Sequence, residues 1–323
     1  MKLTVNRREF VAGSCAALAG VALGRMSSGF TYAPTEQKLA VGCRDVHLKV
    51  TGADDCWAAM RTIGAESVAA TVGDDLSIPA LFHPSRKYTL ATAEGIEQLA
   101  ADAKAAGVKV TAFCMSNRFD TRPDFELEWT AKAAEAAKAL GAKAIRIDVV
   151  PHKLSPQEFP AFAVEILGKL VKATESTGVR FGMENHGGTT NNPEFLRTVF
   201  QGVGSDRLGL TLDTANFYWF GHPLSKLYDL YAEFAPRVVH THCKSIRYPE
   251  SERETQRQRG WKYGDYCCPI YEGDIDFRRV VEILRKAGYA NDLCIENESL
   301  GKFPQAEQGS VLAREIEYLK ELR

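Results

Sequence analysis

The order of apolar and amphipathic segments limits what this chain can fold into more than any other feature. After Lys38, eight short runs of β-branched and apolar residues alternate with longer helical patterns. Most of the runs follow a glycine, which commonly ends the helix before a strand. Eight strand–helix units in series predict an α/β fold with a parallel sheet closed into a (β/α)8 TIM barrel, as a single domain over residues 34–323. The predicted strands are residues 38–43, 66–72, 108–115, 142–150, 179–185, 208–214, 237–244 and 292–298.

The segments between these strands are rich in strong helix formers, and several end in glycine. An open, doubly wound sheet is the alternative architecture. Such a sheet normally carries a glycine-rich phosphate loop after its first strand, and the Gly-Cys-Arg-Asp sequence at residues 42–45 does not provide one. The predicted helices are residues 95–107, 129–141, 193–204, 276–288 and 313–323.

The N-terminal segment, residues 1–33, reads as a separate part of the chain. Arg7 and Arg8 are followed by Phe10 and then by a weakly apolar stretch over residues 11–24. This order is typical of a twin-arginine export signal. We therefore expect residues 1–33 to be a signal peptide and the mature protein to be periplasmic or otherwise extracytoplasmic. A short amphipathic first helix is the alternative, although the glycines of this stretch disfavour a helix that must pack.

Charge and hydropathy narrow the range of partners. The chain has 40 basic and 41 acidic residues and a net charge of −1, whereas proteins that bind nucleic acid usually carry an excess of basic residues. No apolar run after the N-terminal segment approaches the roughly 20 residues that span a bilayer. We expect no nucleic-acid partner and no stable membrane insertion once the signal is removed, and the sequence leaves a homo-oligomer open.

The eight cysteines fall into different settings. Cys15 lies in the predicted signal, whereas Cys114, Cys243 and Cys294 lie in apolar strand-like runs, where a free cysteine behaves as a small buried hydrophobe. The remaining four lie in looser contexts and could pair in an oxidising compartment. They are Cys43, Cys56, Cys267 and Cys268.

Polar side chains end the last four predicted strands, where a TIM barrel carries its chemistry. Glu184, Asp213 and His242 are equally spaced along the chain, one strand–helix unit apart, so these side chains are expected at one height on adjacent strands. Glu296 follows after a longer interval, which contains a polar insertion over residues 246–273. The four groups are therefore expected to form an arc at one mouth of the barrel.

Three carboxylates and an imidazole in one cavity would repel one another and lose solvation without a cation. A divalent metal ion bound by Glu184, Asp213, His242 and Glu296 resolves this. An oxygen-rich set with one imidazole suits Mn²⁺, Mg²⁺, Co²⁺ or Zn²⁺ and does not choose among them; Mn²⁺ is the ion we expect. His240 shares a strand face with His242 and is expected to lie deeper in the barrel, as a core residue or as support for the metal ligands.

These segments resemble the sugar phosphate isomerase/epimerase family of xylose isomerase-like TIM barrels. The resemblance spans residues 38–323 and is carried by GMENHGG (182–188), LTLDTANFYW (210–219), HTHCKS (240–245), YEGDIDF (271–277) and CIENE (294–298). It implies the same four metal ligands and a pair of catalytic glutamates, Glu184 and Glu296. The ketose 3-epimerases of the family have a histidine where this chain has Asn216, which is a departure from their pattern.

The implied function is that of a divalent-metal-dependent isomerase or epimerase of a sugar or keto-sugar. One glutamate would remove a proton next to a carbonyl, and the other would return one, through a metal-stabilised enediolate. The expected contacts to the carbohydrate substrate come from His186, Asn216, Lys244 and Arg247. Aromatic residues in the segment 247–269 could form a lid over the site, or the segment could be a solvated loop.

Other functions remain open on the sequence alone. Loss of a β-leaving group from the same intermediate would make the protein a lyase or hydratase of 3-keto-glycosides or related keto-sugars. Glu184 and Glu296 could instead be the carboxylate pair of a metal-independent glycoside hydrolase. A non-catalytic carbohydrate- or metal-binding protein is the non-enzyme alternative. An apurinic endonuclease-like phosphodiesterase is disfavoured by the balanced charge.

Overall fold

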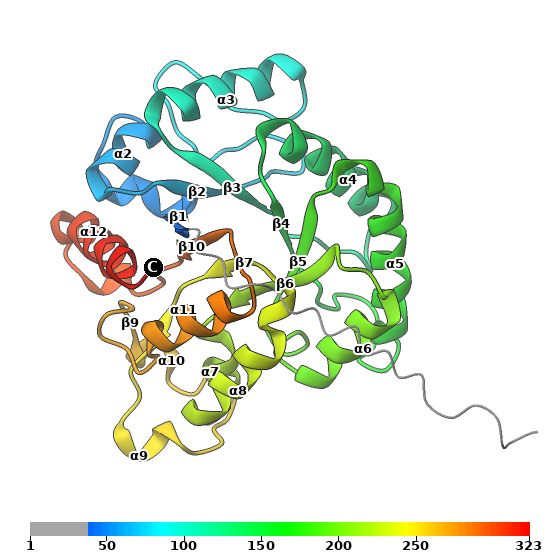
Figure 1. Cartoon of the computed structure of the whole chain (residues 1–323), viewed down its shortest axis with the longest axis vertical. Coiled ribbons are helices and arrows are strands. Elements are labelled where there is room, and N and C mark those ends of the chain that lie inside the picture. Colours follow the sequence, from blue (N-terminus) through cyan, green and yellow to red (C-terminus); the bar gives the residue numbers. More distant parts are fainter. Residues whose placement is uncertain (1–37) are drawn as a thin grey trace, which may run out of the picture. The chain divides into compact units, whose positions relative to one another are not determined.

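The computed structural model describes residues 38–323, which form a ring of parallel strands enclosed by helices (Figure 1). The predicted signal peptide lies outside the described residues. The strands are hydrogen-bonded in the order β10-β1-β2-β3-β4-β5-β6-β7. Each of them overlaps one predicted apolar run. The strands are β1 (Ala40–Arg44), β2 (Ser67–Thr71), β3 (Lys109–Cys114), β4 (Ala144–Ile147), β5 (Arg180–Glu184), β6 (Leu208–Asp213), β7 (Val238–His242) and β10 (Asp292–Ile295).

The last gap in the ring, between β7 and β10, is bridged just past the end of β7. Cys243 forms a parallel bridge with Ile295. Its amide donates to the Cys294 carbonyl at 2.6 Å, and the Glu296 amide donates to the Cys243 carbonyl at 3.1 Å. The sheet is thus a nearly closed barrel, and the predicted TIM-barrel architecture is confirmed.

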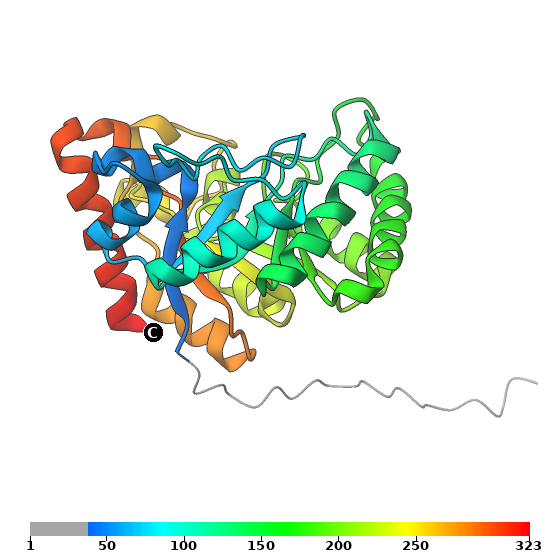
Figure 2. The same ribbon diagram turned by 90° about the horizontal axis from the view of Figure 1, so that it is seen from above.

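Helices cover the outside of the strands, as the view turned by 90° shows for α3 in front of them (Figure 2); α3 and α4 both pack against β3. Gly107 and Gly141 follow α3 and α4 with φ of 71° and 73°, a left-handed conformation in which glycine carries no steric penalty. Three further barrel helices, α2, α5 and α8, were not among those predicted. The longer helices are α2 (Cys56–Ile63), α3 (Ala93–Ala106), α4 (Pro123–Leu140), α5 (Phe159–Ala173), α6 (Pro193–Val203), α8 (Leu224–Phe234), α11 (Phe277–Lys286) and α12 (Gln305–Leu322).

The segment 247–269 is folded. It contains α9 (Glu250–Arg253) and α10 (Tyr263–Tyr266), and it is closed by two antiparallel strands, β8 (Ser245–Ile246) and β9 (Cys267–Cys268). Trp261 stacks on Tyr266 with ring centroids 5.6 Å apart, and Tyr248 packs against both rings. These aromatic side chains therefore hold the segment together.

The two ends of the described chain meet. Helix α12 packs against α2 and β1, and Arg323 donates to the Leu39 carbonyl at 2.8 Å. Within residues 38–323 no helix combines the length and the apolar character needed to cross a membrane. All seven cysteines of this range are free, and Cys43 and Cys56 are buried rather than in loose contexts as expected, because they lie on β1 and α2.

Candidate metal and active site

The four predicted ligands converge at the C-terminal ends of the strands. Each of Glu184, Asp213, His242 and Glu296 offers one donor atom, and these atoms lie within 4.8 Å of one another. His242 Nδ1 is 2.9 Å from Glu184 Oε1 and 3.3 Å from Glu296 Oε2. Both glutamates thus contact the same imidazole nitrogen.

Asp213 is held by the backbone that follows it. Its Oδ1 accepts hydrogen bonds from the amides of Ala215 and Asn216 at 2.8 and 2.9 Å, at the start of the short helix α7 (Asn216–Phe220). Its amide donates to Asn185 Oδ1 at 2.8 Å. Asp213 Oδ2 is therefore left to face the cluster. Lys244 Nζ lies 2.8 Å from it, but within residues 38–323 this oxygen accepts no well-oriented hydrogen bond.

Cations of the protein face the same carboxylates. The buried Arg146 on β4 contacts Glu184 Oε2 through two nitrogens, with Nε at 2.5 Å. Arg44, at the end of β1, donates to Glu296 Oε1 at 2.6 Å. Lys244 Nζ lies between Asp213, Glu296 at 3.2 Å and Glu298 at 3.1 Å. The expectation that only a metal relieves the repulsion is therefore incomplete, because Arg44, Arg146 and Lys244 relieve part of it.

Burial and these charges act on the pKa values in opposite directions. Burial alone would raise the pKa of Glu184, but Arg146 and His242 hold it well below its ordinary value. The pKa of Glu296 is likewise lowered, because His242 and Lys244 outweigh burial. Burial raises the pKa of Asp213, and Lys244 only partly offsets this. Both glutamates are therefore ionised near neutral pH.

The residues expected to contact substrate lie at different distances from this cluster. Lys244 is inside it, and Asn216 is buried beside Asp213 with its Nδ2 unpartnered among the described side chains. His186 is half exposed, and its Nδ1 lies 3.3 Å from Asp148 Oδ1, which raises the pKa of this histidine. Arg247 is exposed, and its charge acts on Asp274.

Several residues of the site were missed from the sequence. Arg44 and Arg146 are charged residues within or at the end of apolar strands, a signal that could have found them. Tyr263 of α10 hydrogen-bonds to Glu298, which also pairs with Lys244. The aromatic residues of the segment 247–269, Tyr263 among them, were expected to form either a lid or a solvated loop, but the hydrogen bond from Tyr263 to Glu298, which follows β10, was not expected.

The barrel and the polar ring at the C-terminal ends of its strands place the protein among TIM barrels with a site at that face. A family model described as the xylose isomerase-like TIM barrel matches residues 57–322. The chain belongs to this family, as the resemblance at residues 182–188 and 294–298 implied.

Similar proteins include sugar dehydratases and epimerases. An inosose dehydratase from Yersinia enterocolitica is 25% identical over 160 residues, which are 48% of this chain and 50% of that protein. The chain thus matches about half the length of this relative. The solved structure of an IOLI protein with a bound zinc atom has a TM-score of 0.64 and 16% identity, covering 88% of this chain and 99% of that one. A 3-keto-D-glucoside 4-epimerase from E. coli has a TM-score of 0.59 and 15% identity, covering 86% and 99%.

Proposed function

We propose that this protein is a divalent-metal-dependent isomerase or epimerase of a keto-sugar, which transfers a proton next to the substrate carbonyl. The observation that carries the proposal is the convergence of Glu184, Asp213, His242 and Glu296, whose donor atoms lie within 4.8 Å of one another at the strand ends. The family and its named relatives support a sugar substrate.

The residues of the site fit a divalent ion. One ion-paired cluster joins five carboxylates and three basic side chains. The basic side chains are those of Arg44, Arg146 and Lys244, and the carboxylates are those of Glu184, Asp213, Glu296, Asp148 and Glu298. With neutral imidazoles, as metal binding requires, this leaves a formal charge of −2. Glu184, Asp213, His242 and Glu296 would hold the ion, which we expect to be Mn²⁺, although the ligand set also suits Mg²⁺, Co²⁺ or Zn²⁺. When bound, the ion would act as a Lewis acid toward the substrate oxygens.

Glu184 and Glu296 are the proposed acid–base pair. Both carboxylates approach the same nitrogen, His242 Nδ1, so a substrate held at the ion would lie within reach of both. Both are ionised, and one can therefore accept the proton while the other, once protonated, returns it. Arg146 and Arg44 hold the two carboxylates in place.

The substrate contacts are proposed for the groups that still have free donors. Asn216 Nδ2 is buried and unpartnered among the described residues, which suits a hydroxyl of the substrate. Lys244 can stabilise a developing oxyanion because it stays charged: burial lowers its pKa, but the negative charges of Asp213 and Glu296 raise it further. His186 and the exposed Arg247 are proposed as outer contacts.

A dehydratase or other lyase acting on a keto-sugar is the second candidate. The contacts between Tyr263, Glu298 and Lys244 favour it, because β-elimination requires a proton donor for the leaving hydroxyl. Burial raises the pKa of Tyr263, so its phenol stays protonated. The inosose dehydratase relatives add support for this reaction class.

The test is incubation of keto-sugars, free sugars and 3-keto-glycosides with the Mn²⁺-loaded protein in deuterated water. Deuterium in a recovered epimer or isomer supports the first proposal, and loss of water or of an aglycone supports the second. Both activities should stop when a chelator removes the ion, whereas a glycoside hydrolase would continue. Mn²⁺ binding without turnover or exchange across the panel would instead indicate a non-catalytic binding protein.

Export by the twin-arginine route is also proposed, on the order of residues 1–33. A variant with Arg7→Lys and Arg8→Lys should stay in the cytosol with its first residues intact, while the unaltered chain is recovered outside the cytosol after cleavage. Equal distribution of both forms would contradict this.

A further inference from the structure

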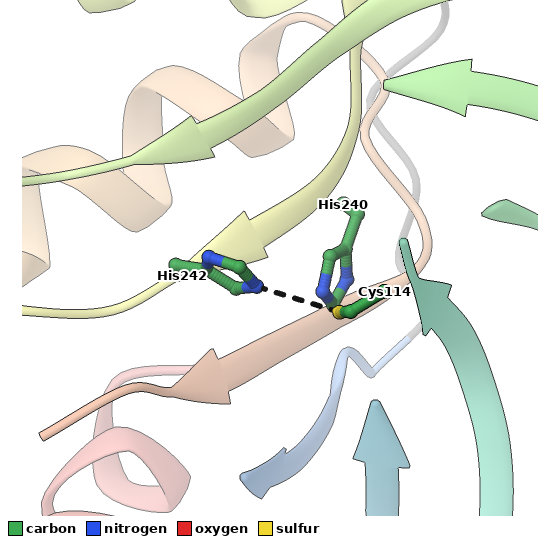
Figure 3. A group of neighbouring side chains, drawn as sticks. All are labelled: Cys114, His240 and His242. Carbon is green, nitrogen blue, oxygen red and sulfur yellow. Dashed lines mark hydrogen bonds between the residues drawn. The ribbon is translucent and has the colours of Figure 1, made fainter. Parts of the chain in front are cut away.

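A second group of donor atoms lies in the barrel interior, next to the carboxylate cluster. Cys114 at the end of β3 points toward two imidazoles of β7, those of His240 and His242, as Figure 3 shows. Cys114 Sγ is 3.9 Å from His242 Nε2, and one donor atom from each residue lies within 4.8 Å of the other two. All three residues are buried.

His240 is oriented as a metal-binding histidine is. Its Nδ1 lies 2.8 Å from Asp292 Oδ1, and the same carboxylate accepts from Thr111 at 2.5 Å and from Tyr289 at 3.0 Å. A carboxylate at Nδ1 fixes the proton there and leaves the Nε2 lone pair free. His240 Nε2 is fully buried and has no hydrogen-bond partner among the described residues. A buried nitrogen of this kind calls for a ligand.

The surroundings of the sulfur are small. The buried residues packed with Cys114 are mostly alanine and cysteine, whereas bulky branched side chains usually fill a TIM-barrel interior. The two guanidinium groups whose charge acts on Cys114, those of Arg44 and Arg146, are each paired with a carboxylate. The neighbours of Cys114 in this layer are Ala69, Ala112, Ala144, Val239 and Cys294.

We propose that Cys114, His240 and His242 form a second metal site, which takes Zn²⁺. One thiolate and two imidazoles are a ligand set suited to zinc, with a fourth position left for another donor. The site differs from the carboxylate site in chemistry, because it contains sulfur and no oxygen ligand. His242 faces both sites through different nitrogens, Nδ1 toward the glutamates and Nε2 toward the sulfur, and a neutral imidazole has one free lone pair, so it would bind one ion at a time. An ion here would tie β3 to β7, which are not neighbours in the sheet, through the barrel interior.

Cobalt titration tests the proposal, because a thiolate bound to Co²⁺ gives a charge-transfer absorption that carboxylate and imidazole ligands do not give. The chelator-stripped, reduced protein is titrated with Co²⁺ without oxygen. We expect the band in the unaltered chain and its loss in Cys114→Ser. It should persist in Cys43→Ser, which alters another buried strand cysteine, and in Asp213→Asn, which alters only the carboxylate site.

Absence of the band in the unaltered chain, or its survival in Cys114→Ser, would overturn the second site. A measurement without substitutions guards against misfolded variants. X-ray absorption of the zinc-loaded chain should contain a sulfur neighbour at about 2.3 Å, and a shell of oxygen and nitrogen alone would overturn the proposal. Neither readout depends on turnover, so the second site and the proposed reaction can fail separately.

Discussion

Replacement of Arg146 by methionine tests how the candidate site is held together. Arg146 and Glu184 are both buried, at 8% and 3% exposure, and two guanidinium nitrogens contact Glu184 Oε2. Arg146→Met would leave Glu184 as a buried charge with His242 as its remaining partner. Removing one member of a buried ion pair typically costs about 3–5 kcal/mol. We expect a cost of about 3 kcal/mol, because His242 still compensates part of the charge.

The assay is denaturant unfolding of the metal-free protein in the presence of a chelator. Arg197→Met is the matched control. Arg197 also donates to one carboxylate, that of Glu233, through two nitrogens, but this pair lies at the surface. It should cost no more than about 1 kcal/mol. Saturating Mn²⁺ should reduce the difference in unfolding free energy between Arg146→Met and the unaltered chain. An ion that binds only the folded state stabilises it, and in the variant the ion would also neutralise the unpaired Glu184.

The double variant Arg146→Met/Glu184→Gln completes the cycle. It leaves no unpaired buried charge, so it should be more stable than Arg146→Met alone. The single variant Glu184→Gln is measured beside them. The reasoning would be refuted if Arg146→Met cost no more than Arg197→Met, or if the double variant lost as much stability as Arg146→Met and Glu184→Gln together.

Three further predictions concern catalysis, substrate binding and pH. Glu296→Gln should lower solvent-deuterium exchange into the substrate on the order of 10²–10⁴-fold, and unchanged exchange would remove Glu296 from the acid–base pair. Asn216→Ala should raise KM by about tenfold with little change in kcat, which is the loss of about one hydrogen bond to the substrate; an unchanged KM would contradict that contact. Burial raises the pKa of Glu315 from 4.5 to about 7, although Ile270 N and Asn297 donate hydrogen bonds to it. Between these values the unfolded chain releases this proton and the folded chain keeps it, so stability should fall by about 3 kcal/mol as pH rises from 4.5 to 7. Unfolding free energies at pH 5 and pH 8 should show this component in the unaltered chain and not in Glu315→Gln, and equal pH dependence would contradict the raised pKa.

The strands, and the end of the barrel at which the polar residues gather, could be predicted from the sequence for a physical reason. Strands of a parallel barrel are buried on both faces, so they appear as apolar runs. The equal spacing of Glu184, Asp213 and His242 is one strand–helix unit, which predicted that the side chains meet at one end of the barrel; in the strand register Asp213 pairs with His242, whereas Glu184 pairs with Thr211, two residues before Asp213. Helix α5 (Phe159–Ala173) was missed although it has a buried apolar face, and it carries a glycine at position 168.

The charged neighbours of the candidate site could not be predicted from the sequence in the same way. Whether Arg146 turns into the barrel depends on the tilt and stagger of β4 against β5, which pairs Arg146 with Gly182 rather than with Glu184. The approach of Tyr263 to Glu298 depends on how the segment 247–269 folds back over the barrel. Both are consequences of tertiary packing between distant parts of the chain.

The central claim is that Glu184, Asp213, His242 and Glu296 bind one divalent ion at the mouth of the barrel. Anomalous diffraction from crystals of the Mn²⁺-loaded protein tests it most directly. The account predicts a single strong peak about 2.0–2.2 Å from a donor atom of each of the four residues. A peak elsewhere, or none at saturating Mn²⁺ with the carboxylates still paired to Arg44, Arg146 and Lys244, would contradict it.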